Sequence, residues 1–121
     1  MLDRNKEIVR TFENEFKNKA NIDIVDELMA PSFVHHAPIP GVGAGPEGLK
    51  QIGHFVFSMI DGIKVTLVHL IAEDDLVCSR ISASGTVKES GQNVQWTENH
   101  FYRVVEGKIV EWWGEGGPPL G

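Results

Sequence analysis

The chain has 121 residues, of which 41% are hydrophobic and 23% are charged, a composition typical of one globular domain that buries a core. A formal net charge of −6, with 11 lysines and arginines that form no stripe, argues against binding to nucleic-acid phosphates. No run approaches the roughly 20 apolar residues of a membrane span. The single cysteine, Cys78, allows no internal disulfide and the N-terminal segment is charged, so we expect a cytoplasmic protein without nucleic-acid or membrane partners.

Helical patterns fill the first half of the chain. Apolar residues recur at helical spacing over residues 3–19, which predicts an amphipathic helix whose charged residues lie on its other faces. A short helix is expected over 23–29, ended by Pro31, and a short extended segment follows at 33–36. After a loop rich in glycine and proline, Pro46 begins a third predicted helix that ends near Ile60.

Beyond Gly62 the apolar pattern changes from helical spacing to alternation. This change predicts strands at 63–72, 76–87, 94–105 and 108–113, joined by short hairpin-like turns. Helices followed by an antiparallel meander indicate a segregated α+β fold, and the space between the two layers can hold a ligand. We treat 1–121 as a single domain, with the segment 114–121, rich in glycine and proline, as a flexible C-terminal tail.

One predicted strand carries polar and aromatic residues at alternate positions. Trp96, Glu98, His100 and Tyr102 occupy positions i, i+2, i+4 and i+6, so their side chains point to the same face of the sheet. A purely structural sheet would place aliphatic side chains there. We therefore expect this face to mark a ligand pocket.

Several local strings, in this order of elements, resemble the SnoaL-like polyketide cyclases of the NTF2-like superfamily over nearly the whole chain. The strings are FVHH at 33–36, GPEGL at 45–49, LIAE at 70–73, YRV at 102–104 and GKIVE at 107–111. The resemblance implies an NTF2-like cone, in which three N-terminal helices pack on a curved antiparallel sheet around an internal cavity. It also implies a small hydrophobic ligand and a homodimer formed through the outer face of the sheet.

The resemblance assigns the reacting groups to two strands. In the cyclases, a histidine and an aspartate act on the substrate, with the carboxylate as acid/base in an intramolecular aldol closure. The histidine position matches His100, whereas the aspartate position falls on Gly114. We favour Glu98 over Glu115 as the replacement acid, because Glu98 shares the face of His100. A carboxylate beside an imidazole in an apolar cavity would move both pKa values toward neutrality and suit acid/base work. The alternative is that the pair only forms a hydrogen bond in a polar patch.

His36 completes the predicted catalytic set of His100, Glu98 and His36. Adjacent side chains of an extended segment point opposite ways, and similarity to related hydrolases and cyclases favours His36 over His35 as the residue that faces the cavity. Trp96, Tyr102 and Trp112 are predicted to bind the ligand as flat walls with polar tips, although core packing would account for them equally. The helix residues Phe55 and Met59 complete the predicted ligand-binding set.

The sequence predicts no cofactor and no metal site. Its five histidines include no His-x-His and no H-E-x-x-H pattern, and the G-x-G-x-x-G match at 43–48 follows no strand. The predicted function is the binding of a small hydrophobic carbonyl compound, with acid/base cyclisation, isomerisation or dehydration as the reaction. The alternative is a binding protein with the same cavity and no chemistry.

Overall fold

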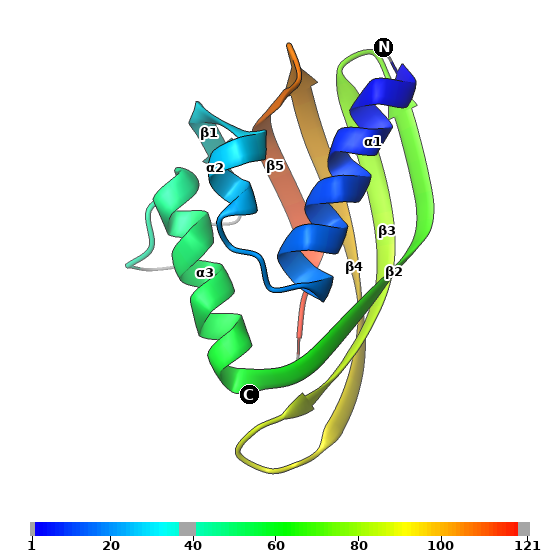
Figure 1. Ribbon diagram of the computed structural model, residues 1–121. Helices are drawn as coiled ribbons and strands as arrows, with labels where there is room; N and C mark the ends of the chain where they lie inside the picture. The colour runs from blue at the N-terminus through cyan, green and yellow to red at the C-terminus, as the bar shows by residue number, and fades with distance from the viewer. Residues whose placement is uncertain (1, 37–40, 119–121) are drawn as a thin grey trace.

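The computed structural model describes residues 2–36 and 41–118 (Figure 1). Its helical elements come first: α1 (Leu2–Phe12), the π-helical turn η1 (Glu13–Asn18), α2 (Ile24–Leu28) and α3 (Pro46–Met59). The strands are β1 (Met29–His35), β2 (Ile60–Glu73), β3 (Leu76–Val87), β4 (Asn93–Val105) and β5 (Lys108–Gly116). In the described part of the chain, no helix is long and apolar enough to span a membrane.

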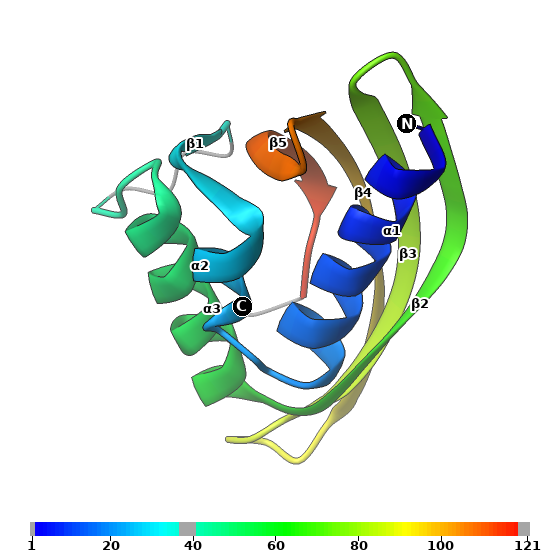
Figure 2. The same ribbon diagram turned by 45° about the horizontal axis from the view of Figure 1, so that its top comes forward.

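The five strands form one sheet in the order β1-β5-β4-β3-β2. Strands β2 to β5 are an antiparallel meander, as predicted. The exception is β1, which pairs parallel with β5, because the long chain between them is not constrained by a hairpin. The sheet curves around α1, while α2 and α3 lie beside β1 and close the open side of the curve (Figure 2). The predicted α+β fold, with helices on a curved sheet, is confirmed.

The predicted first helix is divided between α1 and η1. Val9 and Phe12 are buried on the side that faces the sheet, which confirms the amphipathic pattern. In η1 the wider π turn rotates each residue less about the axis, so Glu13 and Lys17 also turn toward the sheet, with exposed side-chain fractions of 1% and 13%. The expectation that these two charges lie on a polar face is wrong for this reason.

The C-terminal strand is longer than predicted. Strand β5 continues to Gly116 because Gly114, Glu115 and Gly116 pair with β4, opposite His100, Asn99 and Glu98. A tail that starts at residue 114 is therefore wrong, and residues 119–121 of that predicted tail lie outside the described residues.

The hydrophobic core occupies the space where α1, η1, α2 and the start of α3 pack on the sheet. Its buried members are Val9, Phe12, Phe16, Ile24, Val25, Met29, Phe33, Leu49, Val77, Tyr102, Val104 and Ile109. At the edge of the sheet, the Asn18 side chain pairs with the backbone of Val65, accepting from its N–H at 2.6 Å and donating to its carbonyl oxygen at 3.1 Å. This pairing ties η1 to β2 and fixes the place of Lys17 beside the sheet.

Candidate functional site

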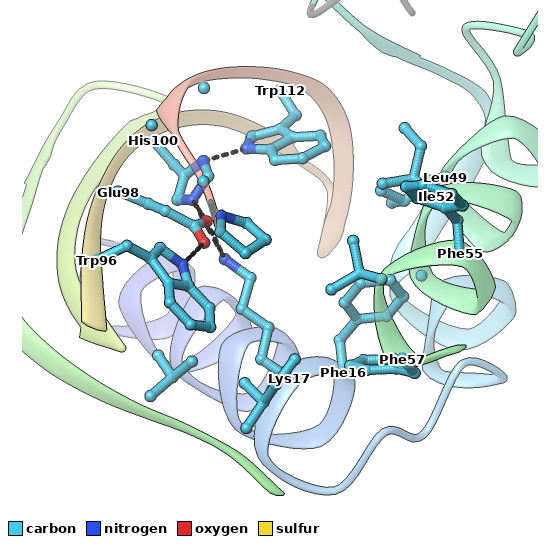
Figure 3. A pocket seen from close by; sticks show the side chains of 18 of the residues that line it. Phe16, Lys17, Leu49, Ile52, Phe55, Phe57, Trp96, Glu98, His100 and Trp112 are labelled. Carbon is cyan, nitrogen blue, oxygen red and sulfur yellow. Dashed lines mark hydrogen bonds and ion pairs between the residues drawn. The ribbon is translucent and has the colours of Figure 1, made fainter. Parts of the chain in front are cut away.

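A cavity of 470 Å³ lies between η1, α3 and the inner face of β2, β4 and β5 (Figure 3). Most of its wall is apolar and comes from one residue of η1, several of α3 and two of β2. These are Phe16, Leu49, Ile52, Val56, Phe57, Ile63 and Val65. Three ionisable side chains also line it: Lys17, Glu98 and His100. We call these three residues the polar end.

The predicted pocket face of β4 is only partly a cavity wall. Trp96, Glu98 and His100 line the cavity, together with Trp112 from the neighbouring strand. Tyr102 does not, although it shares their face. It is fully buried in the core, 5.9 Å from Phe12 between ring centroids. The ligand-binding role predicted for Tyr102 is therefore wrong, because α1 covers this end of the strand.

Glu98 is 8% exposed and accepts hydrogen bonds on both carboxylate oxygens. Its Oε1 accepts from Lys17 Nζ at 3.1 Å and from His100 Nε2 at 2.7 Å, and its Oε2 accepts from Trp96 Nε1 at 2.7 Å. Burial raises the pKa of Glu98, but the charge of Lys17 and the bonds from His100 and Trp96 outweigh burial and lower this pKa to about 2. The expectation that its pKa moves toward neutrality is wrong.

His100 is 2% exposed and is bonded at both ring nitrogens. Trp112 Nε1 donates to His100 Nδ1 at 2.7 Å. An indole nitrogen only donates, so Nδ1 carries no proton, and the ring proton sits on Nε2, which donates to Glu98. These two contacts therefore favour the tautomer of His100 that carries its proton on Nε2.

Lys17 is the site residue that the sequence reasoning missed. Its Nζ lies 2.9 Å from Glu13 Oε2, 3.1 Å from Glu98 Oε1 and 3.1 Å from His100 Nε2. Burial lowers the pKa of Lys17, but the charges of Glu13 and Glu98 prevail and raise it. The one signal in the sequence is the pair Glu13 and Lys17 at i, i+4, next to the buried face.

Glu13 connects the polar end to the core. It is 1% exposed, and its Oε1 accepts a hydrogen bond from the Tyr102 hydroxyl. Burial and the neighbouring Glu13 carboxylate raise the pKa of Tyr102 well above its usual value. Tyr102 thus donates a hydrogen bond to buried Glu13, which in turn pairs with Lys17.

The choice of His36 over His35 as the cavity-facing residue is wrong. His35 is the inward one, 3% exposed, with Nε2 2.9 Å from the carbonyl oxygen of Gly43. His36 lies on the outer side, where its Nε2 is 2.9 Å from Glu111 Oε2 and its ring stacks on Trp113 at 4.8 Å. The two histidines do point opposite ways, but the pairing of β1 with β5 sets the inward parity, and neither lines the cavity.

The two helix residues predicted to bind ligand have different positions. Phe55 lines the cavity and remains 55% exposed, so it lies at the mouth. Met59 is the last residue of α3, where the chain turns into β2, and it does not line the cavity.

Gly114 lies directly opposite His100 in the β4–β5 pairing, as the resemblance requires of the acid position. A Cβ atom at Gly114 would lie 2.8 Å from His100 Nδ1 and 3.4 Å from Trp112 Cζ2. The rings of His100 and Trp112 therefore occupy the space of an acid. Glu115 lines a hollow on the outer face of the sheet, which confirms its opposite parity.

No cluster of three histidine, cysteine or acidic side chains that would hold a metal ion occurs among the described residues. Among the described residues that line the cavity, polar atoms come from the polar end, from Gln51 and from the indole groups of Trp96 and Trp112.

The fold is that of known SnoaL-like and NTF2-like proteins. IdmH, a proposed polyketide cyclase from Streptomyces antibioticus, is 24% identical with a TM-score of 0.82, over 93% of this chain and 91% of that one. AclR, a proposed hydroxylase from Streptomyces galilaeus, is 18% identical with a TM-score of 0.84, over 97% and 91% of the two chains. TsrD from Streptomyces laurentii is 20% identical with a TM-score of 0.83, over 96% and 90%.

No curated protein matches the sequence significantly. The family model for SnoaL-like polyketide cyclases matches residues 7–116, which is most of the 121 residues. The chain therefore belongs to the SnoaL-like polyketide cyclase family.

Proposed function

We propose that the protein binds a small, largely apolar carbonyl compound in its cavity and catalyses an acid/base reaction on it, namely cyclisation, isomerisation or dehydration. The observation that carries this proposal is the polar end, a charged patch in a cavity whose other walls are mostly apolar. The cavity volume of 470 Å³ lies within the range of about 300–1,000 Å³ that is usual for ligand pockets.

The polar end supplies both kinds of group that enolisation needs. Lys17 lines the cavity, so the positive charge of its ammonium would stabilise the negative charge that develops on a carbonyl oxygen. Glu98 is a carboxylate at neutral pH and is placed to accept the proton from the neighbouring carbon. His100 orients this carboxylate through its Nε2 proton. Trp96 and Trp112 would hold the apolar body of the ligand.

The low basicity of Glu98 restricts the substrate. A carboxylate with a pKa of about 2 is a weak base, so the proton that it removes must be acidic. A carbon between two carbonyl groups meets this requirement, whereas the α carbon of a simple ketone does not. The proposed substrates are therefore apolar 1,3-dicarbonyl compounds.

A second candidate is a binding protein without catalysis. Two observations favour it: glycine replaces the acid opposite His100, and the protein's own side chains already engage both oxygens of Glu98 and both nitrogens of His100. In this function the ligand would occupy the same cavity without proton transfer.

Tryptophan fluorescence and hydrogen exchange separate the two candidates. Trp96 and Trp112 line the cavity while Trp113 lies outside it, so Trp113→Phe leaves fluorescence that reports on the cavity alone. The test ligand is 2-acetyl-1-tetralone, a two-ring 1,3-diketone, and NMR in D2O measures exchange at its acidic carbon. Catalysis predicts binding, exchange above the buffer rate, and loss of that exchange in Glu98→Gln and His100→Ala.

The outcomes are distinct. Binding without catalysed exchange would favour the second candidate. If neither this diketone nor any apolar ketone of similar size quenched the cavity tryptophans, the ligand class itself would be wrong. Exchange that His100→Ala leaves undiminished would remove His100 from the proposed mechanism.

We also propose that the protein forms a homodimer through the outer face of its sheet and acts in the cytoplasm. Four apolar or weakly polar side chains lie in register across four strands: Ile71, Cys78, Phe101 and Trp113. Ile71 and Phe101 are 62% and 49% exposed, which favours a partner on this surface. The cytoplasmic location rests on the single cysteine.

A further inference from the structure

Lys17 joins two buried carboxylates to the histidine of the cavity. Its ammonium contacts Glu13 on its own turn and both Glu98 and His100 on β4, within 2.9–3.1 Å. An ammonium loses hydration when it is buried, and close opposite charges are needed to offset that loss. Lys17 is thus held in the polar end by two carboxylates, rather than extended into solvent like an ordinary helix lysine.

We propose that Lys17 is a positioning residue, whose charge keeps Glu98 ionised and whose effect on Glu98 keeps the ring proton of His100 on Nε2. This inference deepens the proposed function, because it assigns the control of protonation at the same site. Its central test needs no ligand, so it can fail or succeed independently of that function.

In the ligand-free protein, the contacts of Glu98 favour its ionised carboxylate. Lys17 and His100 donate to one oxygen, and Trp96 donates to the other. A protonated Glu98 would need an acceptor for its O–H group, but each of these partners is a donor. In this ligand-free arrangement only the ionised form satisfies all of them, and Lys17 is the partner that brings a full positive charge.

The state of His100 follows from that of Glu98. The ring must accept at Nδ1 from Trp112 and donate at Nε2 to Glu98. If Glu98 took up a proton, its carboxyl group would be a weaker acceptor for the Nε2 proton of His100. The contacts at the two ring nitrogens would then no longer fix one tautomer. Lys17 therefore acts on His100 mainly through Glu98.

Few other ionisable groups compete with Lys17 for this role. Those that contact the polar end are Glu13 of η1, which shares the ammonium, and Tyr102 of β4, which donates to Glu13. Among the described residues, α3 and β2 present no ionisable side chain to the cavity, and β5 presents Trp112. The lowered pKa of Glu98 agrees with this role of Lys17, since burial alone would raise that pKa and the charge of Lys17 is the largest opposing effect.

The test compares Lys17→Met, which keeps the apolar stem and removes the charge, with Lys17→Arg, which keeps a charge. Carbon-13 NMR of labelled glutamate carboxyl groups follows the titration of Glu98 in ligand-free protein from pH 3 to 8, and Glu98→Gln assigns the signal. In the wild type and in Lys17→Arg we expect no Glu98 titration above pH 3, since its pKa is about 2. In Lys17→Met the midpoint should rise by about two pH units, as expected on loss of an adjacent opposite charge.

A second measurement follows His100 by nitrogen-15 NMR. The wild type should show the ring proton on Nε2, and Lys17→Met should lose this single tautomer over the pH range in which Glu98 titrates. If Lys17→Met fails to fold because Glu13 is left buried and unpaired, the double variant Lys17→Met/Glu13→Gln removes that charge while keeping an acceptor for Tyr102. An unchanged Glu98 midpoint in whichever of these variants folds would overturn the inference.

The two proposals fail in different ways. If Lys17→Met shifts the Glu98 titration while the diketone is never exchanged, the positioning role stands and the catalytic proposal falls. If catalysed exchange occurs and Glu98 titrates identically in wild type and Lys17→Met, the catalytic proposal stands and the positioning role of Lys17 falls. When both are right, the acid limb of the exchange rate against pH moves upward in Lys17→Met by the same amount as the Glu98 midpoint.

Discussion

Replacing Gly114 with alanine should destabilise the protein by displacing His100. The added Cβ would lie 2.8 Å from His100 Nδ1 and 3.1 Å from its Cε1, closer than non-bonded atoms normally approach. His100 cannot easily withdraw, because Glu98 and Trp112 hold its two nitrogens at 2.7 Å. The effect is steric, since the backbone at Gly114 is not in the left-handed region.

Two opposing effects set the size of the stability loss in Gly114→Ala. Overpacking a buried site costs about 1–3 kcal/mol, whereas replacing glycine with alanine stabilises by about 0.4–1 kcal/mol through the unfolded chain. The net loss for Gly114→Ala is then about 1–2 kcal/mol. At roughly 4 °C per kcal/mol for a domain of this size, Tm should fall by about 4–8 °C.

The assay is thermal unfolding by circular dichroism, with Gly117→Ala as the matched control. Gly117 also lines the cavity, but a Cβ there would meet no atom within 4 Å, so its Tm should stay the same or rise slightly. A nitrogen-15 spectrum should show a changed His100 environment in Gly114→Ala alone. Equal Tm values for the two variants, with an unperturbed His100, would refute the reasoning.

The remaining predictions concern single side chains. The pKa of Glu98 falls from 4.5 to about 2 on folding, so its ionised carboxylate contributes about 3 kcal/mol to the free energy of unfolding above pH 4.5, and this contribution is lost as the pH falls to about 2. In urea unfolding, Glu98→Gln should not show this loss of stability at acid pH. The same loss in Glu98→Gln as in the wild type would contradict the prediction. Tyr102→Phe should lower the free energy of unfolding by about 1–2 kcal/mol, since buried Glu13 loses a donor, without changing ligand affinity by fluorescence titration. His36→Ala should alter neither ligand affinity nor exchange rate, because its partner Glu111 is an outer-face residue; a large loss of either would return it to the site. Phe101→Glu should turn a dimer into a monomer in light scattering, and a monomeric wild type at micromolar concentration would contradict the proposed interface.

The element boundaries show how far the periodicity of the sequence reaches. The range 76–87 was predicted to the residue as β3, and the third helix within a residue or so as α3. The hairpin between β4 and β5 was predicted from Glu106 and Gly107 between two alternating runs. Both residues have positive φ in the structure, as a tight two-residue turn requires. Its register places Gly114 opposite His100, as the resemblance to the family indicated.

The spacing of apolar residues was enough to predict the α+β fold and the shared inner face of Trp96, Glu98 and His100, because that spacing records burial on one side of each element. Which part of that face borders the cavity depends on the packing of the helices: α1 covers Tyr102, while the space beside His100 stays open. The tertiary structure also shows that the π turn of η1 brings Lys17 under Glu98. A local pattern indicates that a side chain points inward, but the packing of distant elements determines whether it meets core, charge or ligand.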